Sequence, residues 1–235
     1  PEKRMTLPHQ RIAAELSDGT AEDYDEILFA ATRGADRRWK EALLAHLDAP
    51  ARVLDLACGT GTLTFMIRDR FPDAEVVGMD VSVARLDHAL KRAHLRRDHR
   101  ARFVLGSFER IAPAGRFDAV TSCYLAKYAD LPRLVSRLRS FLNPGGFVVM
   151  HDLTYPEHPV VRKAWERHFQ RLRQTALNEW PAAIRVFDEL PEIVRRSAWV
   201  EELTMLFVAH GYGGVAVERL GRGTSALVLA RLPCE

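Results

Sequence analysis

An apolar run that ends in a glycine-rich bend, VLDLACGTGT at residues 53–62, limits the architecture more than any other segment. The first half has the apolar residues of a buried strand, and Gly59 and Gly61 then allow backbone angles that other residues rarely adopt. Because glycine has no side chain, a ligand can also lie directly against this peptide. In open parallel sheets, ligands bind beyond the carboxyl ends of the strands, so this bend is a predicted binding site.

Further short apolar runs follow, and they alternate with helical patterns. The runs predicted as strands are residues 52–57, 75–80, 102–106, 117–123 and 146–152. The segments predicted as helices between them are residues 63–70, 83–96 and 131–142. This alternation indicates a parallel, doubly wound sheet.

The last part of the chain departs from this alternation. A helix is predicted at 200–210, and two strands at 214–220 and 225–232 are joined by the turn GRGT, which forces an antiparallel pair. Helical patterns at 23–47 and 155–199 lie outside the alternation. We therefore predict an α/β fold: a Rossmann-like, doubly wound sheet of seven mostly parallel strands with a C-terminal antiparallel hairpin, N-terminal helices, and a helical insert after the fifth strand.

Composition and charge exclude several classes of protein. Hydrophobic residues make up 47% of the chain, as in ordinary globular proteins, and no run approaches the roughly 20 apolar residues that span a bilayer. The basic run at 91–102 lacks the interleaved aromatic residues that base stacking needs, so we expect no nucleic-acid partner. Three cysteines without C-x-x-C spacing suggest no metal site and no disulfide framework. No secretory signal is visible, and a cytoplasmic location is expected.

Three kinds of ligand compete for the glycine bend. A Walker phosphate loop is excluded because no lysine follows the glycines. A dinucleotide fingerprint would need a third glycine where Thr64 stands. S-adenosylmethionine would use an acid at the strand end, which Asp55 supplies. Asp80, at the end of the second strand, is placed to bind the ribose hydroxyls of either nucleotide.

Four motifs in order resemble those of the class I S-adenosylmethionine-dependent methyltransferases. They are VLDLACGTG, GMDVS, FDAVTS and LRSFLNPGGFVVMHD, from Val53 to Asp152. A narrower resemblance, to the C-methyltransferases of ubiquinone and menaquinone biosynthesis, rests on YDEILFAATRGADRRWKEALL before the first strand and FDAVTSCYLAKYAD at the fourth. Where that family shows an Arg-Asn pair after the fourth strand, this chain has Ala126 and Lys127.

The resemblance implies a cofactor, S-adenosyl-L-methionine, and a small acceptor that is apolar and aromatic or quinone-like. Together with the glycine bend it implies a set of cofactor-binding residues, in which Asp80 holds the ribose and Phe108 lies on the adenine. The set is Asp55, Ala57, Gly59, Thr60, Gly61, Asp80, Val81, Ser107, Phe108 and Ser122. The alternatives are N-, O- or S-methylation of another small metabolite, and a non-catalytic nucleotide-binding or regulatory protein on the same fold.

Methyl transfer to a phenolic carbon or oxygen also needs a group that accepts a proton. We expect His151 to be this base, because it stands at the carboxyl end of the fifth strand. Tyr24 and Lys127 are the other candidate catalytic residues, and Tyr24 is expected to close over the cofactor.

The insert after the fifth strand carries an apolar stripe on one helical face, formed by Val161, Trp165, Phe169 and Leu172. The stripe has three interpretations: a lid over an apolar substrate, a homodimer surface, or a peripheral contact with an anionic membrane. We favour the lid, because the insert follows the fifth strand directly above the predicted site. A membrane-borne acceptor would make membrane association compatible with it.

We expect one methyltransferase domain over residues 1–235. The predicted parts are an N-terminal helical cap at 1–50, a cofactor-binding core at 51–152, a helical lid insert at 153–198, and a closing helix and hairpin at 199–235.

Overall fold

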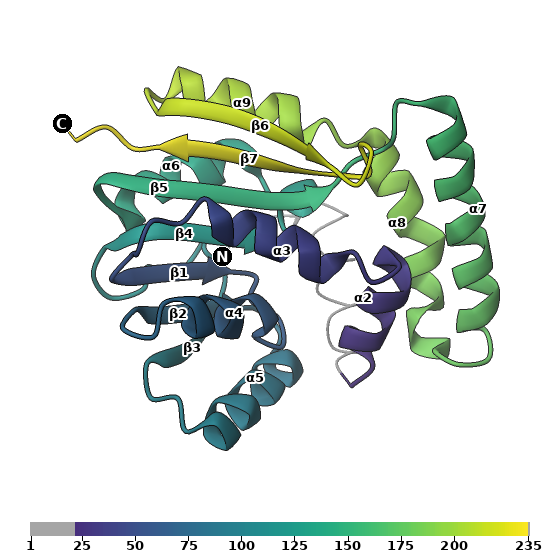
Figure 1. The fold of residues 1–235 in the computed structure, drawn as a ribbon, viewed down its shortest axis with the longest axis horizontal. Helices are drawn as coiled ribbons and strands as arrows, with labels where there is room; N and C mark the ends of the chain where they lie inside the picture. Colours follow the sequence, from purple (N-terminus) through teal and green to yellow (C-terminus); the bar gives the residue numbers. More distant parts are fainter. Residues whose placement is uncertain (1–21, 235) are drawn as a thin grey trace, which may run out of the picture.

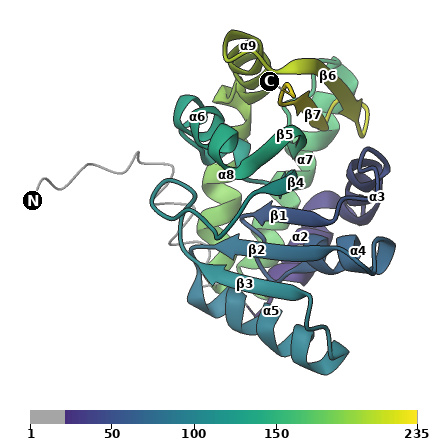
Figure 2. The same ribbon diagram turned by 90° about the vertical axis from the view of Figure 1, so that its left-hand side faces the viewer.

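A computed structural model of the chain describes residues 22–234. Its centre is one seven-stranded sheet in the order β3-β2-β1-β4-β5-β7-β6, seen edge-on in Figure 2. The strands are β1 (Arg52–Leu56), β2 (Glu75–Asp80), β3 (Ala101–Leu105), β4 (Phe117–Cys123), β5 (Leu142–Leu153), β6 (Gly213–Leu220) and β7 (Ser225–Arg231). The five neighbouring strands β3, β2, β1, β4 and β5 pair in parallel, whereas β7 runs antiparallel to both of its neighbours. The predicted seven-stranded sheet with its closing hairpin is confirmed.

The helices fall into two groups. The helices around the sheet are α3 (Asp36–Ala45), α4 (Thr62–Arg70), α5 (Val83–Arg96), α6 (Leu131–Phe141) and α9 (Trp199–Ala209). The helices at the carboxyl ends of the parallel strands are α2 (Tyr24–Thr32), α7 (Pro159–Ala176) and α8 (Ile184–Arg196), with single 3-10 turns at Ala126–Tyr128 and Pro181–Ala183 (Figure 1). The part of the predicted N-terminal cap before residue 22 lies outside the described residues.

Two apolar layers hold helices against the sheet. On one face, Leu134 and Leu138 of α6 pack with Leu203 and Phe207 of α9, and all four side chains are completely buried. On the other face, α3 and α4 pack on the alternate residues of the same strands. Burial on both faces explains why the central strands read as continuous apolar runs rather than as alternating ones.

The strand order reverses between β1 and β4, which both pair in parallel with their neighbours. Loops that leave two adjacent strands in opposite directions open a crevice at this point, where α/β sheets bind their ligands. The glycine bend follows β1 directly, so the sheet places it at this crevice. None of the helices in the described part of the chain is long and apolar enough to cross a membrane.

The principal difference from the predicted boundaries is the start of β5. It begins at Leu142, four residues before the predicted start, because the NPGG segment joins the strand with a register shift opposite residues 117–119. Gly145 makes this irregularity accessible through its positive φ of 76°. The helix before it still ends at Phe141, close to the predicted end at 142.

Candidate active site

A cavity of about 690 Å³ lies at the crevice beyond the carboxyl ends of the strands. Its cofactor half, the part built by the ends of β1 to β3, contains five of the predicted contacts: Ala57, Asp80, Val81, Ser107 and Phe108. Its acceptor half is lined by α2, the loop after β4, and α8. The cavity is within the size range of small-molecule sites.

The glycine bend is tied to Asp80 by a hydrogen bond. Gly59 donates its backbone N–H to Oδ2 of Asp80 at 2.8 Å, and the Ser82 N–H reaches Oδ1 at 2.9 Å. Ala57 and Gly59 both have positive φ, of 55° and 56°. The Asp80 carboxylate is therefore held in place at the end of β2, and each oxygen keeps lone-pair capacity for a further donor such as a ribose hydroxyl.

Gly61 begins helix α4 with a φ of 81°. A Cβ at this position would lie 2.9 Å from the ring of Phe65. Close packing of the helix on the bend thus requires glycine here both for its backbone angle and for its lack of a side chain.

Five of the predicted cofactor contacts do not line this cavity: Gly59, Thr60 and Gly61 of the bend, and Asp55 and Ser122, which have structural partners. Asp55 is buried and accepts hydrogen bonds from Thr64 (2.7 Å) and Thr121 (3.0 Å), and burial raises its pKa to about 6. Ser122 is also buried and donates to the Leu56 carbonyl at 2.7 Å. These contacts join β1 to β4 and α4, so in this structure they support the bend from below.

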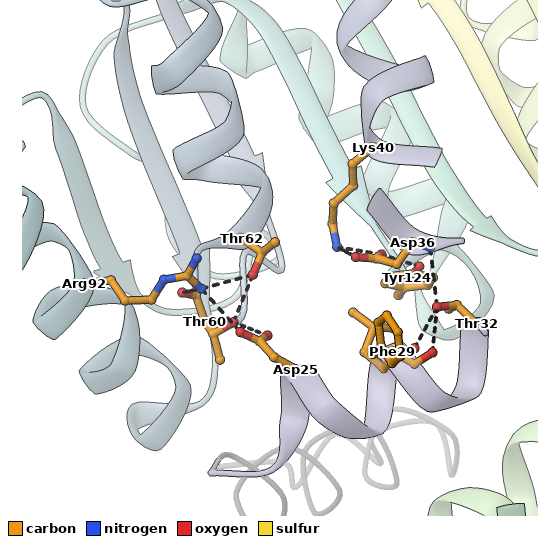
Figure 3. A network of polar contacts seen from close by, with 10 residues as sticks. Asp25, Phe29, Thr32, Asp36, Lys40, Thr60, Thr62, Arg92 and Tyr124 are labelled. Carbon is orange, nitrogen blue, oxygen red and sulfur yellow. Dashed lines mark hydrogen bonds and ion pairs between the residues drawn. The ribbon is translucent and has the colours of Figure 1, made fainter. Parts of the chain in front are cut away.

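Helix α2 is fastened to the glycine bend by side chains (Figure 3). The Thr60 hydroxyl donates to Asp25 at 2.8 Å, and Arg92 of α5 donates to the Thr60 carbonyl and the Thr62 hydroxyl at 3.1 Å each. Arg92 also lies 3.5 Å from the Asp25 carboxylate. Thr60 therefore links the bend to the cap, and this contact brings α2 over the cavity.

Tyr24, at the start of α2, lines the cavity beside the bend. Its ring lies 3.7 Å from the place of a Cβ on Gly59, and the Arg85 guanidinium stacks on it at 4.0 Å from the ring centroid. Burial raises the pKa of Tyr24 although Arg85 opposes this shift. The phenol is thus neutral at physiological pH, and it suits a hydrogen-bond donor better than a base.

His151 lies on the face of β5 that is turned away from the cavity. It is 1% exposed and packs between the rings of Trp39 (5.4 Å) and Tyr124 (5.1 Å). Neither ring nitrogen has a hydrogen-bond partner among the described residues. Burial and the charges of Lys40 and Lys127 lower its pKa to about 3. His151 is also not among the residues that line the cavity, which argues against the expectation that it is the catalytic base.

Its neighbour Asp152 takes the opposite face and binds Lys127. The Lys127 ammonium donates to Asp152 at 2.8 Å and to the Tyr124 carbonyl at 2.9 Å, and it lies 4.4 Å from the Tyr128 ring centroid. Lys127 lines the cavity and is 8% exposed. Burial lowers its pKa, although Asp152 opposes the shift. Of the three candidate catalytic residues, the structure therefore brings Tyr24 and Lys127 to the cavity.

Tyr124 is fixed from two sides at the end of β4. Its hydroxyl donates to Asp36 at 2.6 Å, and Asp36 also accepts from Lys40 of the same helix (Figure 3). Its backbone has a φ of 67°, a strained angle for a residue with a side chain. Such strain is common in active sites, where the surrounding contacts hold the backbone in place.

The acceptor half contains residues that sequence reasoning did not identify. It is apolar, and the side chains that form it come from α2, β5 and α8: Ile27, Leu28, Ala31, Leu153, Val186, Phe187 and Leu190. The sequence of α8 did contain an indication that one face of this helix is buried, because the apolar residues Phe187, Leu190 and Val194 are at helical spacing. Arg85, which also lines the cavity, is not among the site residues predicted from the sequence.

The apolar stripe of α7 packs inside the molecule. Trp165, Phe169 and Leu172 are buried against Trp180 and Phe187 from the following segments. The stripe is therefore used by the contact between α7, α8 and α2, and α8 is the helix of the insert that faces the cavity. No group of three or more metal-binding side chains occurs within residues 22–234.

Comparison with known proteins agrees with this geometry. A family model described as a methyltransferase domain matches residues 53–146. A demethylmenaquinone methyltransferase of Thermus thermophilus is 32% identical over 214 residues, which cover 89% of this chain and 96% of that protein. A trans-aconitate 2-methyltransferase of Methylobacterium radiotolerans is 35% identical over 170 residues, 69% of this chain and 59% of that protein.

Solved structures share the fold at low sequence identity. An O-methyltransferase family protein from Burkholderia thailandensis superposes with a TM-score of 0.61 at 16% identity over 86% of this chain. Phosphoethanolamine N-methyltransferase 2 of Haemonchus contortus, solved with S-adenosyl-L-methionine, gives a TM-score of 0.59 at 16% identity over 83% of this chain. The chain spans 57% and 52% of the length of these two structures.

The sheet, the glycine bend and Asp80 together define an S-adenosylmethionine-dependent methyltransferase. Within that class, the chain belongs to the methyltransferase family that includes the demethylmenaquinone methyltransferases.

The residues of the cofactor half suit S-adenosyl-L-methionine, which supplies an electrophilic methyl group. The fixed Asp80 carboxylate suits a ribose diol, and Val81, Phe108 and Leu105 offer apolar surface for an adenine. Among residues 22–234, the atoms within 4 Å of the place of a Cβ on Gly59 belong to Tyr24 and Arg85. The roles of single residues toward the cofactor stay predictions.

Proposed function

We propose that the acceptor is an apolar, quinone-like aromatic molecule in its reduced, hydroxylated form. The observation that carries this proposal is the acceptor half of the cavity, whose walls from α2 and α8 are apolar while its floor holds one buried cation, Lys127. An aromatic ring with an alkyl substituent and a hydroxyl group matches that distribution. The name of the Thermus relative supports the same class of acceptor.

In this proposal Lys127 stabilises the nucleophilic form of the acceptor. An aromatic carbon attacks the methyl group well only when the neighbouring hydroxyl has lost its proton, and a nearby ammonium favours the resulting phenolate. Asp152 and the Tyr124 carbonyl occupy two of the three ammonium protons, so one N–H is left to bind the acceptor oxygen. S-adenosylmethionine would supply the methyl group in this reaction, and the acceptor would release its hydroxyl proton before the attack and its ring-carbon proton after it to solvent water.

Tyr24 and the rest of α2 contribute to positioning. Methyl transfer is an in-line displacement, and holding the acceptor in line with the breaking bond accounts for much of its rate. Helix α2 contributes both Tyr24 near the bend and Ile27 in the acceptor half. It therefore spans the two halves of the cavity, where cofactor and acceptor would meet.

A quinone-like acceptor would reside in a membrane, so a peripheral membrane contact belongs to the proposal as well. The α7 stripe does not provide that contact, because it is buried inside the molecule. A homodimer and a single domain over 1–235 also stay proposals.

The test is to incubate the protein with S-adenosylmethionine and a reduced naphthoquinol, and to measure the methylated product and S-adenosylhomocysteine by mass spectrometry. Trans-aconitate serves as the comparison acceptor, since one relative is named for it. We expect methylation of the quinol and none of trans-aconitate. Methylation of trans-aconitate alone would contradict the proposal.

A variant of Lys127 tests its role. Because its hydrogen bond to the acceptor oxygen strengthens as charge develops, Lys127→Met should lower kcat by about 100-fold and leave the affinity for S-adenosylhomocysteine unchanged. Lys91→Met, an exposed residue of α5, is the matched control and should keep its turnover. Unchanged kcat in Lys127→Met would remove this residue from the reaction.

A further inference from the structure

Arg85 occupies an unusual position at the cofactor half of the cavity. It lies in the first turn of α5, and its Cδ is 4.0 Å from the place of a Cβ on Gly59. The guanidinium stacks on the Tyr24 ring and lines the cavity together with Asp80. Arg85 and Tyr24 thus lie beside the buried peptide of the bend at Gly59, where the missing side chain would let a ligand approach the backbone.

The guanidinium of Arg85 has no anionic partner in the structure. Among the residues from 22 to 234 it makes no hydrogen bond or ion pair, and its buried Nε is unsatisfied. Arg68, another partly buried arginine, binds the Asp98 carboxylate at 2.9 Å. The nearby Asp80 directs its oxygens to the backbone N–H groups of Gly59 and Ser82 instead. Arg85 is half-buried and its Nε is buried without a partner, so the site favours a ligand that brings an anion.

We propose that Arg85, which lies over the Tyr24 ring, binds the α-carboxylate of the methionine part of S-adenosylmethionine. That carboxylate is the only anionic group of the cofactor, and a guanidinium matches it with two parallel hydrogen bonds. The sulfonium and the amino group are cations and would be repelled. Asp80, which accepts the Gly59 N–H, is left for the ribose, so Asp80 and Arg85 would bind different parts of the cofactor.

Tyr24 acts in this arrangement as the support for the guanidinium plane. The ring restricts the side chain of Arg85 to one orientation, which lowers the entropy lost when the carboxylate binds. Since Asp25, the next residue, is bonded to Thr60, the support is itself fastened to the bend. Binding of the carboxylate would therefore also stabilise the position of α2 over the cavity.

The test compares two ligands that differ in the amino-acid part. S-adenosylhomocysteine carries the carboxylate, whereas 5′-methylthioadenosine keeps the adenosine and the thioether sulfur but has no carboxylate. Their affinities are measured by titration calorimetry on the wild-type protein, Arg85→Gln and Arg85→Lys, with no acceptor present. Lys91→Gln, which removes an exposed charge from the same helix, is the matched control.

We expect Arg85→Gln to weaken S-adenosylhomocysteine binding by about 10- to 100-fold, while 5′-methylthioadenosine changes by less than about threefold. Arg85→Lys should show a smaller loss, because it keeps the charge but not the paired donors. Tyr24→Leu should reproduce part of the loss and Tyr24→Phe should not. An equal loss for both ligands, or no loss for either, would overturn the proposal. Because no acceptor is used, failure of the quinol proposal would leave this result unaffected.

Discussion

Neighbouring residues at the end of β5 have opposite roles because side chains alternate along a strand. His151 enters the layer beneath α3, where it is neutral and unpaired, whereas Asp152 faces the cavity side and holds Lys127. The sequence located both residues at the end of a strand. It did not reveal which of them faces the ligand, since both faces of this sheet are buried and the apolar pattern does not mark the difference.

The buried His151 makes the stability of the protein depend on pH. Its pKa is about 3 in the folded chain and about 6.5 in the unfolded chain, so only the unfolded chain binds this proton near pH 5. The free energy of unfolding should therefore fall as pH drops below about 6.5, with a contribution of about 2 kcal/mol by pH 5. Asp55, whose pKa is raised to about 6, acts in the opposite direction and favours the folded chain as pH falls.

The measurement is urea unfolding of the wild-type protein and of His151→Leu, each near pH 7 and near pH 5. We expect the loss of stability between these two conditions to be about 2 kcal/mol smaller in His151→Leu, since the substitution removes this proton and no other. The same loss in both proteins would show that His151 titrates normally in the folded state.

At the scale of elements, most of the fold could be predicted because each signal is local. Strand and helix boundaries follow from apolar runs, from Ser82 and Asp130 as N-terminal caps, and from glycines at turns, and nearly all agree within about one residue. The exception is β5, where Gly145 permits a strand to pass through a segment that normally ends regular structure. The extra residues at the start of β5 belong to the strand because they pair with β4, and a local sequence pattern does not indicate such pairing.

The start of α4 supplies a prediction about glycine. Gly61 and Gly223 have nearly the same φ, 81° and 82°, but only Gly61 has a neighbour, Phe65, where a Cβ would be. Gly223→Ala should therefore cost only the backbone strain, about 1 kcal/mol, whereas Gly61→Ala should cost at least about 2 kcal/mol. Thermal unfolding of the two variants measures the difference. Equal losses would mean that helix α4 does not pack on the bend as described.

At the scale of the whole molecule, the chain builds a cavity from parts that are distant in sequence. Helix α2 precedes the sheet and α8 follows β5, and both reach the carboxyl ends of the strands (Figure 1). The cofactor half could be predicted because its residues lie in strand-end motifs. The acceptor half could not be predicted, since it depends on how α7, α8 and α2 pack together. An apolar stripe on one helix does not show which other element will pack against it.

The packing of α7 inside the molecule predicts the effect of truncating its stripe. Phe169 is buried among Trp165, Trp180 and α2, so Phe169→Ala should lower the free energy of unfolding by about 3–5 kcal/mol. Val160 lies on the same helix but is 71% exposed, and Val160→Ala should change the free energy of unfolding by less than about 0.5 kcal/mol. A stripe that served only a membrane or a second subunit would leave the monomer's stability unchanged in both variants, as urea unfolding in dilute buffer would show.

The proposed activity depends above all on the glycine bend and Asp80 as the place where the cofactor binds. A crystal structure of the protein with S-adenosylhomocysteine tests this most directly. We expect the ribose hydroxyls to bind Asp80, the adenine to lie among Val81, Leu105 and Phe108, and the sulfur to point toward the acceptor half. A nucleoside bound outside this cavity, or a bend still covered by Tyr24 and Arg85 in the complex, would contradict it.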